Sequence, residues 1–258
     1  MSGKTGHVRG TDAAYRRAGP TGQEVSVSFA LLLGAAFVLG VRHALDPDHL
    51  VAVSTLVAEE RRLWPAARLG LWWGAGHLVP IAAVGLPLVA LRVRLPEAWE
   101  HTVDLGVGVL LVALGLRTLW VLRRERVHFH VHEHDGRAHP HFHTHLGGPD
   151  HAHAHTSERV RGRISFLVGV VHGLAGSGAA AVVAMTAATS LAAGVAYLLA
   201  FGVGTWAGMF LTSLCIAAPT LAAVSRWERL YQIVRASAGL ASVAVGVGMW
   251  LEILPALL

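Results

Sequence analysis

The chain carries the stretch Arg42-His43-Ala44-Leu45-Asp46-Pro47-Asp48-His49 in the middle of an apolar run from Val27 to Val57. An aspartate at the centre of a membrane helix costs about 2.5–3.5 kcal/mol on insertion scales. A membrane segment therefore keeps such residues where they face a cavity, a partner or an ion. We interpret the stretch as a polar site inside a membrane protein.

The same run is too long for one straight helix across a bilayer. Its 31 residues, at about 1.5 Å each, exceed a hydrocarbon core of about 30 Å. Pro47 has no N–H, so it leaves the carbonyl of His43 without its helical partner and moves Asp46 away from helical geometry. The run predicts a first helix broken near Pro47, with irregular backbone that is buried in protein or lines a water-filled cavity.

Histidine and aspartate at this spacing indicate a metal site. On an unbroken helix His43, Asp46 and His49 form one slanting stripe, whereas a break can bring Asp48 to the same place. Imidazole and carboxylate together suit a divalent cation such as nickel, cobalt or zinc. The alternative is a turn at the membrane surface that ends a cytoplasmic helix. The apolar residues 50–57 argue against that alternative.

The composition is that of a polytopic membrane protein. Of the 258 residues, 53% are hydrophobic and 14% are charged, which is below the charged fraction of soluble domains. The net charge of +5 comes with arginines placed between apolar segments, so we expect the lipid bilayer, and no nucleic acid, as a partner. The single cysteine, Cys215, excludes an intrachain disulfide, and the four methionines lie away from the motif.

Six apolar segments predict an all-α protein with six transmembrane helices. Residues 1–25 are polar and without apolar periodicity, so we expect a disordered N-terminal segment. The first three-helix membrane repeat then occupies 26–126, and the second occupies 164–258. The expected spans are about 27–57, 66–91, 103–122, 164–189, 194–217 and 233–254.

The two halves resemble each other. Residues 37–45 match residues 166–174 at an offset of 129, and residues 73–77 match residues 201–205 at an offset of 128. Because each half has three spans, the second half is inverted relative to the first, as in many secondary transporters. This architecture predicts that His43 and His172 occupy equivalent places and face one central site.

Residues 127–163 are a different kind of sequence. Eleven of the 17 histidines lie in this His-rich loop, which reads as metal-binding by composition or, in the alternative, as a solvated linker. Arginines concentrate in the loops after the first, third and fifth spans, which places those loops in the cytoplasm. The His-rich loop is then cytoplasmic, and both termini lie outside.

At residues 43–49 the chain resembles the nickel/cobalt transporter (NiCoT) family, whose signature is His, four residues, then Asp-His. The resemblance implies metal-selecting residues at His43, Asp48 and His49, with Asp46 alongside. It also implies a multi-pass protein of a prokaryotic plasma membrane.

Two further motifs support this resemblance. Gly76-His77 is similar to the family's second histidine-bearing motif, and residues 172–177 are more like the shorter, six-span urease-accessory-type nickel permeases. The chain departs from the best-known members by having Pro47 in place of alanine, and six spans in place of eight. Its His-rich loop also resembles related nickel/cobalt efflux proteins, so both directions of transport stay open.

The leading hypothesis is a secondary transporter for Ni²⁺, with Co²⁺ as a second substrate, acting in uptake. His77 would complete the metal site, while Asp46 and His172 would be ligands or would orient them. No nucleotide-binding motif is present, because the only lysine is Lys4. The protein is expected to be no enzyme and to need no cofactor, and a cytoplasmic metal acceptor is a candidate partner.

Three rival hypotheses remain at this stage. The first is nickel/cobalt efflux. The second is an intramembrane metal-dependent hydrolase, since two histidines and an aspartate can hold a catalytic zinc, although His-Glu-x-x-His is absent. The third is a metal sensor in which the His-rich loop is active and the membrane part is inert.

Overall fold

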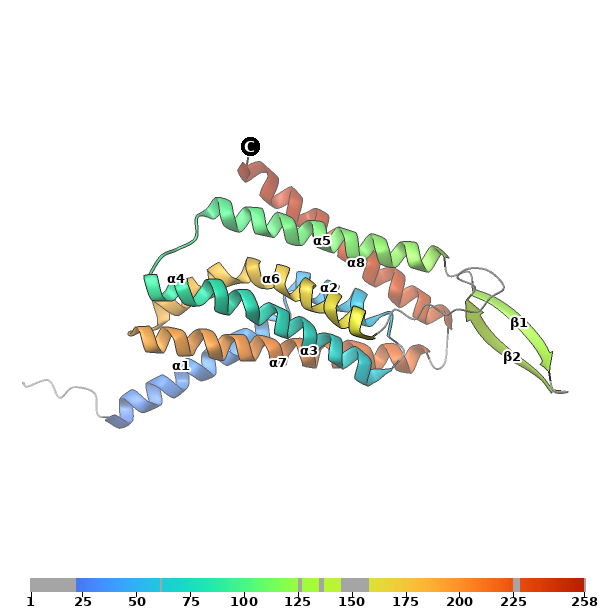
Figure 1. Cartoon of the computed structure of the whole chain (residues 1–258), viewed down its shortest axis with the longest axis horizontal. Coiled ribbons are helices and arrows are strands. Elements are labelled where there is room, and N and C mark those ends of the chain that lie inside the picture. The colour runs from blue at the N-terminus through green and yellow to red at the C-terminus, as the bar shows by residue number, and fades with distance from the viewer. Residues whose placement is uncertain are drawn as a thin grey trace, which may run out of the picture.

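The computed structural model describes residues 22–60, 62–124, 127–134, 137–144, 158–224 and 228–257 (Figure 1). Helices build the bundle, and one two-stranded hairpin stands at one end of it. The helices of the first half are α1 (Gly22–His43), α2 (Pro47–Val57), α3 (Leu63–Pro80), the π-helical η1 (Ile81–Gly85), α4 (Leu86–Leu91) and α5 (Glu97–Arg124). Those of the second half are α6 (Glu158–Ala187), α7 (Leu191–Val224) and α8 (Glu228–Leu257).

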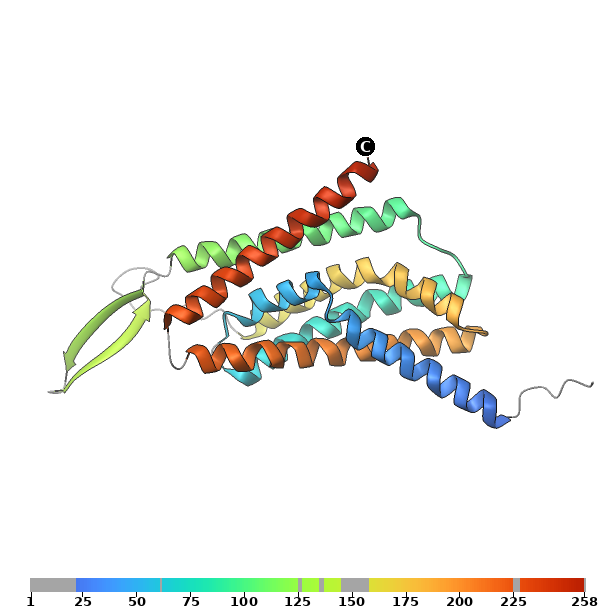
Figure 2. The same ribbon diagram turned by 180° about the vertical axis from the view of Figure 1, so that it is seen from behind.

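The helices agree with the prediction of a six-span membrane protein. Within the described residues, five spans are long and apolar enough to cross a bilayer, among them α3, η1 and α4 taken together as one span over residues 63–91. The pair α1 and α2 passes the same test as one span bent by 58°, which gives six. Figures 1 and 2 show the start of α1 and the end of α8 directed away from the hairpin.

The predicted break near Pro47 is present. Helix α1 ends at His43, and α2 begins at Pro47, where a missing N–H costs nothing. Asp46 has extended backbone at the N-cap of α2, with φ −61° and ψ 146°. The carbonyl of His43 accepts a hydrogen bond from the N–H of Asp46 at 3.1 Å, in place of the helical bond that proline removes.

The structure corrects two predictions about the segments outside the bundle. Helix α1 already begins at Gly22, so residues 22–25 are helical and not disordered, while residues 1–21 lie outside the described part. Within the predicted loop, β1 (Val127–His134) pairs antiparallel with β2 (Arg137–Thr144). The alternation of histidine with other residues has the period of a strand, which a reading by composition alone overlooks.

Close helix contacts relate the two halves in a regular way. A Cβ on Gly40 would overlap the carbonyl of Phe201, and one on Gly169 would overlap the carbonyl of Trp73. These positions correspond at the offsets of 129 and 128, so the contact of α1 with α7 is matched by the contact of α6 with α3. The inverted repeat stays a prediction, and these paired contacts are the ones a two-fold relation between the halves would produce.

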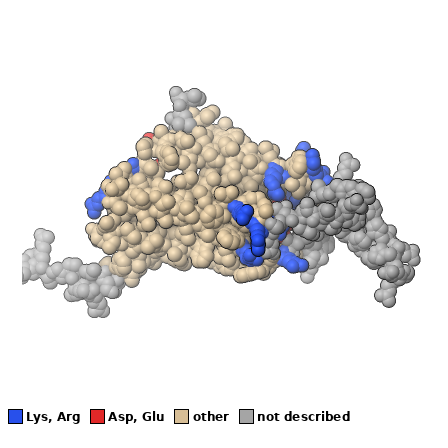
Figure 3. Space-filling view, viewed as in Figure 1, with Lys and Arg blue, Asp and Glu red and all other residues tan. Residues whose placement is uncertain are grey.

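The surface of the bundle is suited to a bilayer. Figure 3 shows basic side chains toward the two ends and a broad band between them without charged atoms. Three of the exposed tryptophans lie near the ends of spans, with Trp64 and Trp120 at the hairpin end and Trp99 at the opposite end, whereas Trp72 and Trp206 lie within spans. Tryptophan prefers the membrane–water interface, so Trp64, Trp99 and Trp120 mark the two boundaries of the span.

Candidate metal centre

Three histidines from three helices converge in the middle of the bundle. His43 ends α1, His49 lies in the first turn of α2, and His77 lies in α3. Each offers a nitrogen, and the three nitrogens lie within 4.8 Å of one another. His77 is fully buried and His49 is 2% exposed, whereas His43 is partly open. The three imidazoles are close enough to bind one cation together.

The local backbone explains why these side chains meet. The break at residues 44–46 turns the chain by 58°, so His43 and His49 come from two differently directed helices and not from one stripe. Their ring centroids are 4.6 Å apart. Gly176 of α6 makes room, because a Cβ there would lie 3.1 Å from Nε2 of His43.

Two carboxylates stand behind two of the histidines. Nδ1 of His43 donates to Oδ2 of Asp46 at 2.7 Å, and Oδ2 of Asp48 lies 2.9 Å from Nδ1 of His49. A carboxylate on one imidazole nitrogen fixes the tautomer and orients the other nitrogen for a metal. The geometry thus gives Asp46 an orienting position behind His43, while Asp48 places a carboxylate beside His49 without a hydrogen bond to its ring.

The free nitrogens of the cluster are the main polar anomaly of the core. Nε2 of His43 and both ring nitrogens of His49 and of His77 are buried and have no hydrogen-bond partner among the described residues. Buried polar atoms are nearly always paired, so a group of unpaired nitrogens at one place requires an explanation. Coordination of a metal ion supplies one.

His172 is a neighbour of the cluster. Its Nδ1 donates to the carbonyl of Val168 at 2.9 Å, which leaves its buried Nε2 without a partner in the described chain. Its ring centroid is 5.2 Å from that of His49, but it does not belong to the group of nitrogens within 4.8 Å. The ring of Trp73 lies beside both histidines, with its centroid 5.4 Å from that of His49 and 5.6 Å from that of His172.

Two acids near the site, Glu100 and Asp104, were not predicted from the sequence. Asp104 of α5 lies close enough to Asp48 and Glu100 for their charges to interact. The carboxylate of Glu100 lies against α6, where a Cβ on Gly178 would be only 2.8 Å from its Oε1. The sequence does show these two carboxylates four residues apart at the start of an apolar span, which could have marked them as candidate site residues. It does not show how α5 packs, and that packing sets their distance from Asp48.

The cluster opens to one end of the bundle. A cavity of about 240 Å³, the access cavity, is lined by His43, Asp46 and Arg42 and by residues of α6 and α7. Its lining follows α6 from Gly176 to Val183, toward the C-terminal end of that helix. An ion can therefore reach His43 from the end of the bundle opposite the hairpin.

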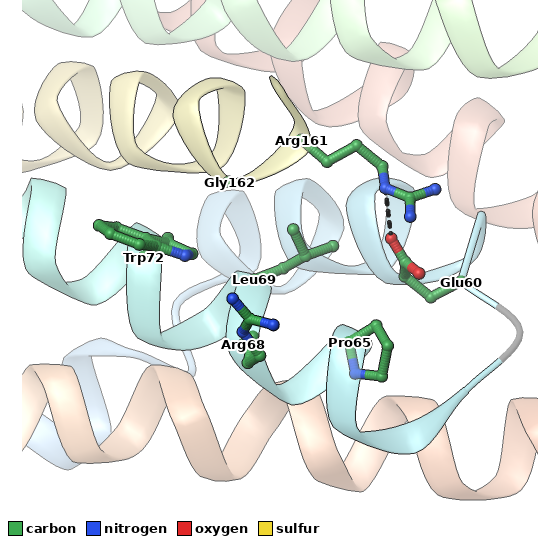
Figure 4. A pocket seen from close by; sticks show the side chains of 7 residues that line it. All are labelled: Glu60, Pro65, Arg68, Leu69, Trp72, Arg161 and Gly162. Atoms are coloured by element: carbon green, nitrogen blue, oxygen red, sulfur yellow. Dashed lines mark ion pairs between the residues drawn. The ribbon is translucent and has the colours of Figure 1, made fainter. Parts of the chain in front are cut away.

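Ion pairs close the other end. Glu60, after the end of α2, pairs with Arg161 of α6 at 3.0 Å, and its side chain is 5% exposed (Figure 4). Glu59 pairs with Arg117 of α5. The pocket beside Glu60 and Arg68, shown in Figure 4, has a volume of about 10 Å³, which is roughly the room for one water.

Comparison with known proteins relates this chain to nickel-transport proteins. The family model described as high-affinity nickel-transport protein (NicO) matches residues 29–226. The urease accessory protein UreH of Bacillus sp. (strain TB-90) is 31% identical over 193 residues, which cover 75% of this chain and 79% of that protein. The high-affinity nickel transport protein of Cupriavidus necator is 33% identical over 95 residues, covering 33% of this chain and 26% of that protein. No solved structure matches the chain.

Proposed function

Since the chain belongs to the high-affinity nickel-transport protein family and is a nickel transporter of the cell membrane, we propose that it acts in uptake, with Co²⁺ as a second substrate. We propose further that the ion passes through the site of His43, His49 and His77. The convergence of their unpaired nitrogens carries this proposal. Family membership makes the chain a permease and not the intramembrane hydrolase considered above.

The ligand chemistry suits the cargo. Imidazole binds nickel and cobalt well, whereas calcium and magnesium prefer an all-oxygen site. Asp46 and Asp48 add negative charge near the ion. Three neutral imidazoles with two carboxylates behind them can replace part of the water shell of a divalent cation at membrane depth.

The cavity and the ion pairs support uptake as the direction. The distribution of arginines puts the hairpin end of the bundle in the cytoplasm, so the access cavity faces outward. Glu59 and Glu60, with their arginine partners, close the cytoplasmic side in this conformation. A divalent cation moving inward gains about 4.6 kcal/mol per 100 mV of membrane potential, which favours import without a nucleotide.

Efflux is the second candidate, and the hairpin is the observation that favours it. The strand register places three pairs of histidines opposite each other: His128 with His143, His130 with His141, and His132 with His139. A tract of this composition can collect metal on the cytoplasmic side, either after import or for export.

Deleting residues 127–157 tests the role of the His-rich loop. We expect cells that express the deletion variant to keep most of the nickel accumulation of the wild type, because the site of His43, His49 and His77 is untouched. The measurement is cell-associated nickel by elemental analysis at trace external metal. Complete loss of accumulation, with normal amounts of protein in the membrane, would instead support the sensor hypothesis.

Asp46→Asn tests the orienting carboxylate. The amide keeps the size of the side chain but loses its charge, so we expect the nickel affinity of the purified protein to fall about 10–100-fold, as for other groups behind a metal ligand. Titration calorimetry measures the affinity in the variant that lacks residues 127–157, because the histidines of that loop would bind nickel as well, and Glu97→Gln removes an exposed acid of α5 as a control. Equal affinity of Asp46→Asn and the wild type would exclude this role.

A further inference from the structure

A second cavity lies at the outward end of the bundle, apart from the metal centre. It has a volume of about 220 Å³ and lies where α4 and α6 end and α7 begins. Its polar lining includes Arg92, Arg94, Thr186 and Ser190, and its apolar lining includes Val89 and Met185. We call it the arginine cavity.

The arginine cavity carries uncompensated positive charge. Arg92 and Arg94 are exposed, neither forms an ion pair within the described chain, and no aspartate or glutamate lines the cavity. Arg92 has a φ of 53°, the only positive φ of a non-glycine residue that the structure describes. Two guanidinium groups offer ten N–H donors at one opening, a pattern that suits a phosphate or a carboxylate.

The start of α7 adds to this charge. Ser190 accepts a hydrogen bond from the N–H of Ala193 at 3.2 Å and so caps the helix. The positive end of the dipole of this helix therefore faces the same opening that Arg92 and Arg94 line. An anion placed there is favoured by both the arginines and the helix.

The surroundings of the cavity are apolar and face lipid. Leu91 is 72% exposed, Leu191 and Val93 are each 50% exposed, and all three flank or line the opening. A small soluble anion would leave these side chains in contact with nothing but the bilayer. An anion that carries acyl chains would use the arginines for its head group and the apolar side chains for its tails.

From these features we propose that the arginine cavity binds the phosphate group of an anionic phospholipid. Val183 lines the access cavity and Ala184, the next residue of α6, lines the arginine cavity, so a bound lipid would lie beside the entrance to the metal site. Its single negative charge would offset part of the positive charge of two arginines that otherwise repel an approaching divalent cation. This proposal about lipid binding does not depend on the proposed direction or substrates of transport, so each can be tested without the other.

The test measures binding to the purified full-length protein in a mild detergent. Native mass spectrometry follows titration with dioctanoyl phosphatidylglycerol, with dioctanoyl phosphatidylcholine and with inorganic phosphate. We expect the wild type to bind phosphatidylglycerol about tenfold more tightly than phosphatidylcholine, and Arg92→Ala/Arg94→Ala to lose that preference, a difference of one decade in Kd. Arg92→Ala keeps the Cβ, so it leaves the backbone at this position unchanged.

A matched control removes the same charge elsewhere. Arg62→Ala/Arg123→Ala removes two exposed arginines at the hairpin end and should retain the preference for phosphatidylglycerol. The melting temperature of each variant without lipid shows that it is folded. Unchanged lipid binding in Arg92→Ala/Arg94→Ala, or an equal loss in the control, would overturn the proposal. Arginine-dependent binding of inorganic phosphate without binding of the lipid would overturn it as well.

Discussion

His49→Ala is expected to abolish high-affinity nickel binding by the purified protein. His49 is almost completely buried, its ring contacts those of His43 and His77, and Asp48 lies 2.9 Å from its Nδ1. Loss of this side chain removes one of the three converging histidines and leaves the partly exposed carboxylate of Asp48 without the neighbouring imidazole. We expect an affinity more than about 100-fold weaker, since groups behind a ligand already cost 10–100-fold.

The experiment needs the His-rich loop removed, because eleven histidines there would bind nickel as well. Titration calorimetry is therefore done on the variant that lacks residues 127–157, with and without His49→Ala. His101→Ala is the matched control, since His101 lies on α5 outside the cluster. Retention of wild-type affinity by His49→Ala would show that the cluster is not the binding site.

Gly76→Ala is expected to have the largest effect on stability. A Cβ at Gly76 would overlap the carbonyl of Phe166, and the backbone of α6 cannot yield as a flexible side chain would. Overpacking of this kind costs about 1–3 kcal/mol and sometimes more. Gly76 also directly precedes His77, so separation of α3 from α6 would displace one of the three histidines proposed to bind the ion.

Gly106→Ala provides the comparison for this prediction. Gly106 lies in α5 and has nothing within 4 Å of its added Cβ, so alanine there should stabilise the helix by about 0.5–1 kcal/mol. Thermal unfolding in detergent measures both variants. The prediction is a lower melting temperature for Gly76→Ala and an equal or higher one for Gly106→Ala. Equal melting temperatures of the two variants would contradict the close contact of α3 with α6.

Much of this architecture could be predicted, because it depends on which residue types follow one another in the sequence. A proline and two aspartates inside a long apolar run predicted the broken first span, and apolar length predicted six spans. His77 was predicted from a motif, and the structure brings it to His43 and His49.

The remainder depends on three-dimensional packing, which the sequence does not show. On a straight helix Asp48 points away from His43, whereas the bend of 58° changes the direction of α2, which carries both Asp48 and His49. Glu100 and Asp104 come close to the site only because α5 packs against α2 and α6. The strands β1 and β2 were not predicted, because the prediction for this segment rested on its histidine content. The alternation of residues along it, which has the period of a strand, was the property that predicts them.

The most direct test of nickel uptake through this site compares wild type and His43→Ala in whole cells. Cell-associated nickel is measured by elemental analysis at trace external metal, with empty vector as the baseline and equal amounts of both proteins in the membrane. We predict accumulation above the baseline for the wild type and none for His43→Ala. Depletion of nickel below the baseline that depends on His43 would make the protein an exporter and contradict this account.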